Sequence, residues 1–258
     1  MEKVFIKNRD GKKVCVVIEQ AQNPKGLALL MHGLSGNKNE EQVVNLAQVL
    51  AAHSYTVVRF DTTNTYGESE GSFEESTPIG YYNDLVDVIT WAKAQAWYTE
   101  PYVLGGTSLG GLCITLFAEN YPREVKGLIL QSPVISGKLL CESPKWQAQL
   151  PEWKQTGYRV ETSKSHPDVV KKLPYSYVQE ILYYDSLSEA FKLTMPVLVM
   201  VGEKDQTTPV EHQQVLFAAL PGKKEFRVIK DAPHTVRDSE QLMGIRNILD
   251  QWVKSTFV

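Results

Sequence analysis

The stretch Pro101-Tyr-Val-Leu-Gly-Gly-Thr-Ser-Leu-Gly-Gly-Leu-Cys-Ile-Thr-Leu-Phe117 decides how the rest of the chain is organised. Its apolar start predicts a buried strand, the glycines around Ser108 predict a sharp turn, and the apolar spacing that follows predicts a helix. Residues 106–110 fit the pattern G-x-S-x-G, which holds a serine on a strained strand-to-helix turn with its hydroxyl exposed. Side chains at 106 and 110 would collide where the strand end meets the helix start, so both positions require glycine.

The five-residue pattern alone is a weak signal, because Gly67-Glu-Ser-Glu-Gly71 matches it as well. Ser69 lies in a polar, acidic segment with no helical run behind it. Ser108 has an apolar strand before it and, after it, apolar residues at helical spacing: Leu109, Leu112, Cys113, Leu116 and Phe117. This setting favours Ser108 over Ser69 as an exposed nucleophile.

Composition excludes several classes of protein. The 258 residues suit one large α/β domain, or one domain with an inserted piece. A net charge of −3 gives no basic footprint for nucleic acid, and no run approaches the ~18 apolar residues of a membrane span, so stable membrane insertion is not expected. The first residues lack the apolar core of a signal peptide. Three scattered cysteines without C-x-x-C spacing predict reduced thiols, no metal site and a cytoplasmic location: Cys15, Cys113 and Cys141.

Strands and helices alternate along most of the chain. Apolar and polar residues alternate over 3–19 on both sides of Asp10-Gly11, which predicts an antiparallel hairpin. Asn39 and Gln42 resemble a capping box that opens a helix ending near His53. Further strands are predicted at 26–31, 56–60, before Ser108, and at 125–131, 195–201 and 226–229, with helices after Pro78, after Pro209 and to about Val253. This order predicts the α/β class: a mostly parallel central sheet with helices on both faces.

Residues 134–194 interrupt the alternation with prolines and a cluster of tryptophans and tyrosines. We therefore predict a core in two parts, 1–133 and 195–258, and an inserted cap at 134–194 over the functional edge of the sheet. Trp146, Trp153 and Tyr175 are the predicted substrate contacts in this cap. The same rings would serve equally well to pack the cap against itself.

A serine hydroxyl needs a positioned base, usually a histidine held by a carboxylate, to act as a nucleophile. Of the five histidines, His234 occupies the loop between the last strand and the last helix. Asp205 follows the strand at 195–201 and gives the chain order Ser108, Asp205, His234. Two other acids lie too near His234 in sequence to be its partner: Asp231 and Asp238. Three histidines fall in predicted helices or in the cap: His53, His212 and His166.

The tetrahedral intermediate of acyl transfer needs N–H donors aimed at its oxyanion. One predicted donor is the backbone N–H of Leu109, the residue after the nucleophile. The second is expected in the loop His32-Gly-Leu-Ser-Gly36, at the N–H of Leu34. His32 is then expected to support this loop rather than to transfer protons.

Several short blocks follow one another along the chain: His32-Gly33, Phe60-Asp61 with Gly67-Glu68-Ser69, Gly106-Thr107-Ser108-Leu109-Gly110, Met195-Pro196-Val197-Leu198, Gly202-Glu203-Lys204-Asp205 and Pro233-His234. In this order and at these separations they resemble α/β-hydrolases of the serine-aminopeptidase, monoacylglycerol-lipase-like and cinnamoyl-esterase-like group. The resemblance covers nearly the whole chain, implies the α/β-hydrolase fold, and makes Gly67-Glu68-Ser69 a structural loop. Asn64-Thr65-Tyr66 and Thr207-Thr208 depart from the residues usual in that group.

These residues predict a serine hydrolase that needs no metal or organic cofactor. The favoured function is a carboxylesterase acting on a small-molecule ester with a small or medium, apolar or aromatic acyl group. An aminopeptidase-type peptidase would need cap carboxylates to hold the substrate ammonium, and Glu142, Glu152 and Glu161 are available. A lipase or thioesterase would need a long apolar groove, and a ligand-binding or inactivated protein of the same fold also stays open. The sequence does not indicate an oligomeric state.

Overall fold

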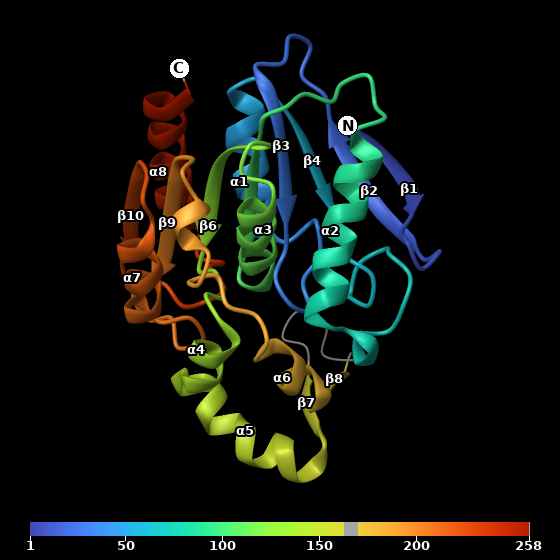
Figure 1. The fold of residues 1–258 in the computed structure, drawn as a ribbon, viewed down its shortest axis with the longest axis vertical. Helices are drawn as coiled ribbons and strands as arrows, with labels where there is room; N and C mark the ends of the chain where they lie inside the picture. The colour runs from blue at the N-terminus through green and yellow to red at the C-terminus, as the bar shows by residue number, and fades with distance from the viewer. Residues whose placement is uncertain (163–169, 258) are drawn as a thin grey trace.

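The structure is a computed structural model that describes residues 1–162 and 170–257. Its centre is an eight-stranded sheet (Figure 1). The strands lie in the order β1 (Glu2–Lys7), β2 (Lys13–Glu19), β4 (Tyr55–Phe60), β3 (Gly26–Met31), β5 (Tyr102–Thr107), β6 (Val125–Gln131), β9 (Val197–Gly202) and β10 (Lys224–Ile229). β1 and β2 form the predicted antiparallel hairpin, β2 pairs antiparallel with β4, and all the later pairs are parallel.

Helices cover both faces of the sheet. One face packs against α1 (Glu41–Ala52) and α8 (Ser239–Phe257), and the other against α2 (Pro78–Ala92), α3 (Leu109–Asn120) and α7 (Val210–Ala219) (Figure 1). Because side chains alternate along a strand, Leu29 of β3 packs toward α2 and α3, whereas Leu30 packs toward α1. Coverage on both sides explains the continuous apolar runs of these strands. The predicted α/β fold is confirmed. No helix in the described ranges is long and apolar enough to cross a lipid bilayer.

Between β6 and β9 the chain leaves the sheet and forms an inserted segment, residues 134–194, most of which lies beyond one end of the sheet (Figure 1). It contains α4 (Gly137–Glu142), α5 (Pro144–Thr156), β7 (Tyr158–Thr162), β8 (Val170–Pro174), α6 (Ser176–Ile181) and the 3-10 helix η2 (Ala190–Lys192). The boundaries at 134 and 194 stay a prediction, and His166 lies outside the described residues.

Two local predictions are wrong. β7 and β8 pair as a separate antiparallel hairpin, where the prediction has no strand. These strands are exposed or half-buried at most positions and rich in charged residues, so no apolar run marks them. The predicted capping box is also absent, because α1 begins at Glu41 without a side-chain cap. The Oδ1 atom of Asn39 instead accepts a hydrogen bond from Arg59, at 3.0 Å.

Glu119 on α3 holds a buried carboxyl group, and its Oε1 has no hydrogen-bond partner in the described part of the chain. Burial, with the carboxylates of Glu189 and Asp185 nearby, raises the pKa of Glu119 to about 8. Because this pKa lies above the unfolded value of about 4.3, the contribution of Glu119 to stability is greatest below pH 4 and falls as the pH rises through 8. At pH 8.5 we expect Glu119→Gln to be ~2 kcal/mol or more stable than the wild type, with little gain at pH 5. Urea unfolding at both pH values measures this, and an equal pH dependence in the two proteins would contradict it.

Candidate active site

Ser108 stands on the turn between β5 and α3, with a backbone φ of 51° and ψ of −117°. Positive φ is strained for a residue other than glycine and is held here by the packing around the turn. A Cβ atom on Gly106 would lie 2.7 Å from the carbonyl carbon and oxygen of Gly110. A Cβ atom on Gly110 would in turn collide with the carbonyl oxygens of Met31 and His32. Both glycines therefore have the steric role that the sequence predicts.

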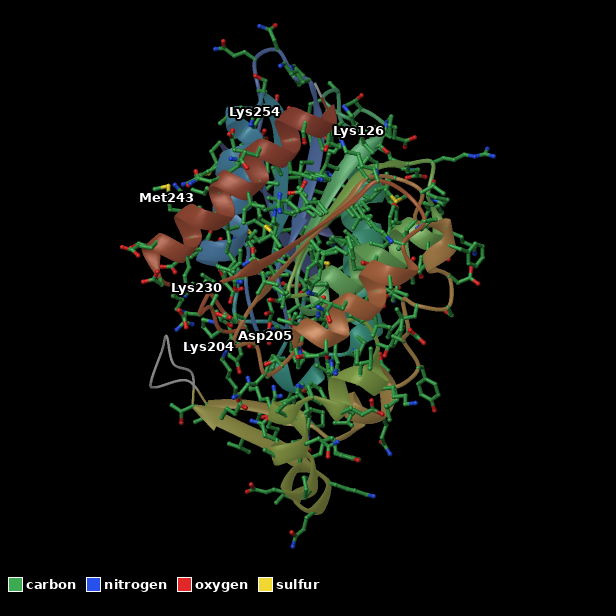
Figure 2. All side chains as sticks on the ribbon, turned by 90° about the vertical axis from the view of Figure 1, so that its left-hand side faces the viewer. Lys126, Lys204, Asp205, Lys230, Met243 and Lys254 are labelled. Atoms are coloured by element: carbon green, nitrogen blue, oxygen red, sulfur yellow. The ribbon has the colours of Figure 1, made fainter. Side chains whose placement is uncertain are left out.

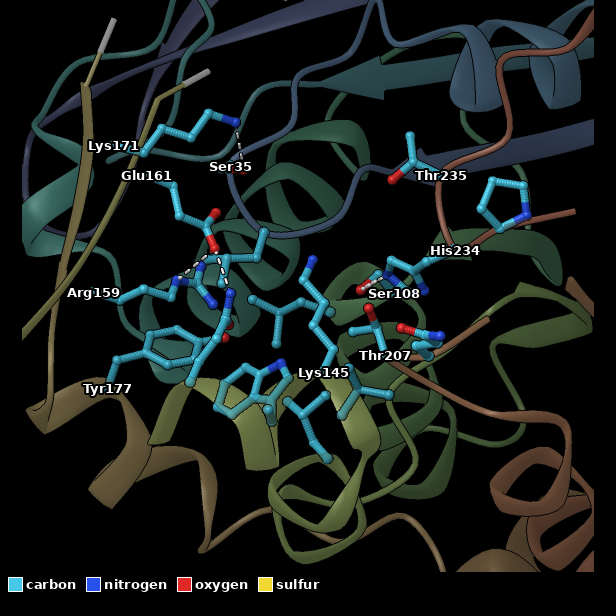
Figure 3. A pocket seen from close by; sticks show the side chains of 18 of the residues that line it. Ser35, Ser108, Lys145, Arg159, Glu161, Lys171, Tyr177, Thr207, His234 and Thr235 are labelled. Carbon is cyan, nitrogen blue, oxygen red and sulfur yellow. Dashed lines mark hydrogen bonds and ion pairs between the residues drawn. The ribbon is translucent and has the colours of Figure 1, made fainter. Parts of the chain in front are cut away.

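The structure brings Ser108, His234 and Asp205 together, from loops that follow β5, β10 and β9. His234 Nε2 lies 3.0 Å from Ser108 Oγ (Figure 3). On the other side of the ring, His234 Nδ1 lies 2.8 Å from Asp205 Oδ2. Figure 2 shows Asp205 at the end of the sheet that faces the inserted segment. Parallel strands carry these residues to a common edge, which explains how positions up to 126 apart in sequence make hydrogen bonds.

The carboxylate of Asp205 is buried and fully engaged. Its Oδ1 accepts the backbone N–H groups of Thr207 and Thr208, both at 2.8 Å, while Oδ2 faces His234. Burial raises the pKa of this carboxyl, but the hydrogen bond and charge of His234 and the two backbone donors outweigh it and lower the pKa to about 2. Asp205 is therefore ionised at neutral pH and can stabilise an imidazolium beside it.

The loop after β3 packs directly against the nucleophile. A Cβ atom on Gly33 would lie 3.0 Å from the Cβ of Ser108. His32 is fully buried, with Nδ1 2.7 Å from the Gly33 carbonyl oxygen, and its Nε2 accepts the N–H of Thr62 at 3.1 Å. Burial lowers the pKa of His32, so a neutral ring that supports the loop agrees with this geometry. The donor roles of Leu34 and Leu109 stay predictions, and both residues line the cavity beside Ser108.

That cavity has a volume of about 770 Å³ and lies between the sheet edge and the inserted segment. Ser108 and His234 form part of its wall, and Trp146 and Tyr177 contribute apolar surface from the inserted segment (Figure 3). A cavity of this size is typical of a small-molecule site.

Residues 22–240 match the family model described as serine aminopeptidase, S33. The chain belongs to this family. It is an α/β-hydrolase, as the order of its sequence blocks predicts.

Several relatives of this chain bear the names of hydrolases. It is 24% identical to the uncharacterized 31.7 kDa protein in the traX-finO intergenic region of Escherichia coli, over 88% of this chain and 90% of that protein. It is 25% identical to lysophosphatidylserine lipase ABHD12 from Macaca fascicularis, over 88% of this chain but only 53% of the relative. Among solved structures, Est1E from Butyrivibrio proteoclasticus with bound ferulic acid has a TM-score of 0.77 and 23% identity, over 98% of both chains. Mouse alpha/beta hydrolase domain-containing protein 10 has a TM-score of 0.79 and 18% identity, over 99% of both.

Of the three aromatic residues predicted to contact substrate, the structure brings Trp146 to the cavity of this α/β-hydrolase but not Trp153 or Tyr175. Trp153 is 1% exposed, and its indole N–H donates to the carbonyl oxygen of Leu173 at 3.0 Å. Its ring contacts those of Trp146 and Tyr175. These two rings pack the inserted segment, which is the alternative that the sequence left open.

The sequence patterns did not identify Thr208 as part of the site. Its Oγ1 lies 3.0 Å from Asp205 Oδ2 and 3.2 Å from His234 Nδ1. It also lies 3.1 Å from the carbonyl oxygen of Ser132. A sequence signal for this role was that Thr207-Thr208 depart from the residues usual in the group. Hydroxyl residues just after an aspartate favour a turn in which polar groups hydrogen-bond to the aspartate carboxylate.

Ser69, which fits the same five-residue pattern as Ser108, has both hydrogen-bonding functions of its hydroxyl in use. It accepts the N–H of Cys15 at 2.8 Å and donates to the carbonyl oxygen of Asp61 at 2.7 Å. These bonds tie the loop after β4 to β2. The structural role that the family resemblance implies for Gly67-Glu68-Ser69 agrees with them.

Among the described residues, one group has the spacing of a metal site: Cys15, Asp61 and Glu68. The ammonium group of Lys38 lies 2.7 Å from Asp61 Oδ2 and 2.6 Å from Glu68 Oε2. Burial raises the pKa of the Cys15 thiol to about 11, so this thiol stays protonated and is a poor metal ligand. Lys38 supplies the positive charge here, and the cluster is a structural ion-pair network.

Proposed function

We propose that this S33-family protein is a serine esterase that works through an acyl-enzyme. The observation that carries the proposal is the continuous hydrogen-bonded series from Ser108 through His234 to the buried Asp205. The tautomer of His234 that fits these contacts carries its proton on Nδ1, facing Asp205. Its Nε2 lone pair then accepts a hydrogen bond from Ser108 Oγ.

In this mechanism Ser108 Oγ attacks the ester carbonyl carbon while His234 Nε2 takes its proton. The N–H groups of Leu34 and Leu109 stabilise the oxyanion, and each such donor contributes about 3 kcal/mol to the transition state. His234 then gives its proton to the departing alcohol. Water attacks the acyl-enzyme by the same route, which releases the carboxylic acid and restores Ser108.

The cavity favours an ester over an N-terminal aminoacyl substrate. Among its described lining residues Glu161 is the one carboxylate, and Glu142 and Glu152 do not line it. Glu161 is already engaged by Arg159 at 3.6 Å and by the amide of Gln149 at 2.9 Å. A substrate ammonium would therefore find no unpaired carboxylate among the described lining residues of this cavity, and it would face the cationic side chains of the wall.

Related proteins bear names that describe thioester and lipid-ester hydrolysis, namely palmitoyl-protein thioesterase ABHD10 and lysophosphatidylserine lipase ABHD12. These names support acyl transfer from oxygen or sulfur. The cavity here mixes apolar walls with charged side chains, and this favours a small or medium acyl group over a long alkyl chain.

Comparison of 4-nitrophenyl butyrate with leucine 4-nitroanilide tests this choice. We expect kcat/KM for the ester to exceed that for the aminoacyl anilide by about 10²-fold or more, because 4-nitrophenolate leaves more readily than 4-nitroaniline and because the leucine ammonium would face the cationic wall. Ser108→Ala controls for uncatalysed cleavage. Faster turnover of the anilide would contradict the esterase proposal and favour an aminopeptidase.

A further inference from the structure

The wall of the 770 Å³ cavity is positively charged although the whole chain has a net charge of −3. Its described residues include one carboxylate, Glu161, and five cationic side chains: Lys145, Arg159, Lys171, Lys204 and Arg237. Like charges gathered in one cleft raise its potential and attract ligands of the opposite sign.

Arg159 and Lys204 each have a strong anionic partner. Arg159 pairs with Glu161 and stacks over the ring of Trp153, 4.8 Å from its centroid. Lys204 pairs with Asp231 at 2.5 Å and is 65% exposed. Neither of them by itself requires a negatively charged ligand.

Lys171 is different, because it is half-buried, faces the site and forms no ion pair with any of the described residues. It projects from β8 across the cavity, and its Nζ donates to Ser35 Oγ at 2.9 Å (Figure 3). Within the described part of the chain, no carboxylate lies within 4.0 Å of this ammonium group. Burial lowers the pKa of Lys171, as expected where an ammonium loses water without gaining an ionic partner.

A candidate counter-ion is Glu40, which lines a smaller recess of about 130 Å³ together with Ser108, Lys171 and Arg237. Burial raises the pKa of Glu40 to about 7, so this carboxyl is only partly ionised at neutral pH. The same recess contains Gln131, whose buried amide has no hydrogen-bond partner among the described residues. The cationic side chains of Lys171 and Arg237 and the side-chain amide of Gln131 therefore all line the space beside Ser108.

We propose that the substrate is an anionic ester, with a carboxylate or phosphate group beyond the ester bond, and that Lys171 binds this anion. The proposal rests on the esterase function and names the substrate class of the same site. The incoming anion gives Lys171 the counter-charge that the described residues do not supply, while the ester carbonyl lies at Ser108. Lys171 is a specificity residue in this proposal and takes no part in proton transfer.

Two matched pairs of esters test the proposal and separate the two possible positions of the anion. The first pair is 4-nitrophenyl hydrogen suberate and its neutral methyl ester, which differ in charge on the acyl side. The second is 1-octanoylglycerol 3-phosphate and 1-octanoylglycerol, which differ on the alcohol side. We expect the wild type to prefer the anionic member of at least one pair by about tenfold or more in kcat/KM, as a charge-assisted hydrogen bond provides.

Lys171→Met should abolish this preference, and Lys171→Arg should retain most of it. The matched control is Lys172→Met on the same strand, because Lys172 pairs with Glu74 and does not line the cavity. The ratio of the two kcat/KM values is the readout, so any general loss of activity cancels. A wild-type ratio near one, or a ratio that Lys171→Met leaves unchanged, would overturn the proposal.

A binding measurement keeps the test independent of turnover. The ligand is monomethyl suberate if the preference lies on the acyl side, or 1-octanoylglycerol 3-phosphate if it lies on the alcohol side. It is titrated into Ser108→Ala and into the same variant with Lys171→Met, and about tenfold weaker binding to the double variant is expected. Equal or undetectable binding in both would overturn the anion site. If neutral esters are cleaved in a Ser108-dependent way without any preference for anions, the esterase function stands and only this proposal fails.

Discussion

Replacing Ser108 with alanine is expected to lower kcat/KM for ester hydrolysis by about 10⁴-fold or more, and to abolish labelling by a fluorophosphonate probe. The hydroxyl is placed to attack a substrate carbonyl, because it lies 3.0 Å from His234 Nε2 on a turn that exposes it to the cavity. Alanine removes the nucleophile and leaves the backbone N–H groups in place. Some residual activity above the rate in water is therefore expected from binding and oxyanion stabilisation.

Ser69→Ala is the matched control, since Ser69 fits the same sequence pattern but its hydroxyl bonds Cys15 and Asp61. This variant should lose about 1 to 2 kcal/mol of stability with its two hydrogen bonds, and it should still react fully with the probe. Equal labelling of wild type and Ser108→Ala, or no labelling of the wild type, would exclude Ser108 as the nucleophile. The second result would instead favour an inactivated or ligand-binding protein.

The inner strands of the central sheet could be predicted because they are buried on both faces. Gly26–Met31 is buried at all six residues, and such strands must be apolar throughout, which distinguishes them from the polar loops at their ends. The candidate site follows from the same topology. Parallel strands end at one edge, so polar residues after β5, β9 and β10 had to lie together.

The inserted segment could not be predicted in the same way. A tryptophan that packs a small hairpin and a tryptophan that contacts a substrate are both buried, so the pattern does not separate Trp153 from Trp146. Lys171 gives no signal either, because lysine is common on exposed strands. Its contact with Ser35 joins residues 136 apart, and only the folded chain brings that pair together.

Asp205→Asn is expected to lower kcat/KM by about 10⁴-fold, although the side chain keeps its shape. The N–H groups of Thr207 and Thr208 point at Oδ1, so an amide at this position must place its oxygen there. Its NH₂ group then faces His234 Nδ1, where the carboxylate Oδ2 stood at 2.8 Å. A donor in that place forces His234 to carry its proton on Nε2, which leaves no lone pair to accept the proton of Ser108.

Asp231→Asn is the control for this variant. Asp231 lies on the same loop as His234, is exposed, pairs with Lys204, and has a φ of 55° that asparagine tolerates. Its activity should stay within about twofold of the wild type.

The ionised Asp205 stabilises the fold above about pH 4, and this contribution falls as the pH drops through 2, so Asp205→Asn also loses ~2 kcal/mol of stability at pH 7. A circular dichroism melt separates the loss of stability of Asp205→Asn from its loss of activity. If the folded variant keeps wild-type activity, the tautomer argument is refuted. If the folded variant has a 10⁴-fold defect, the loss arises from the chemistry at His234.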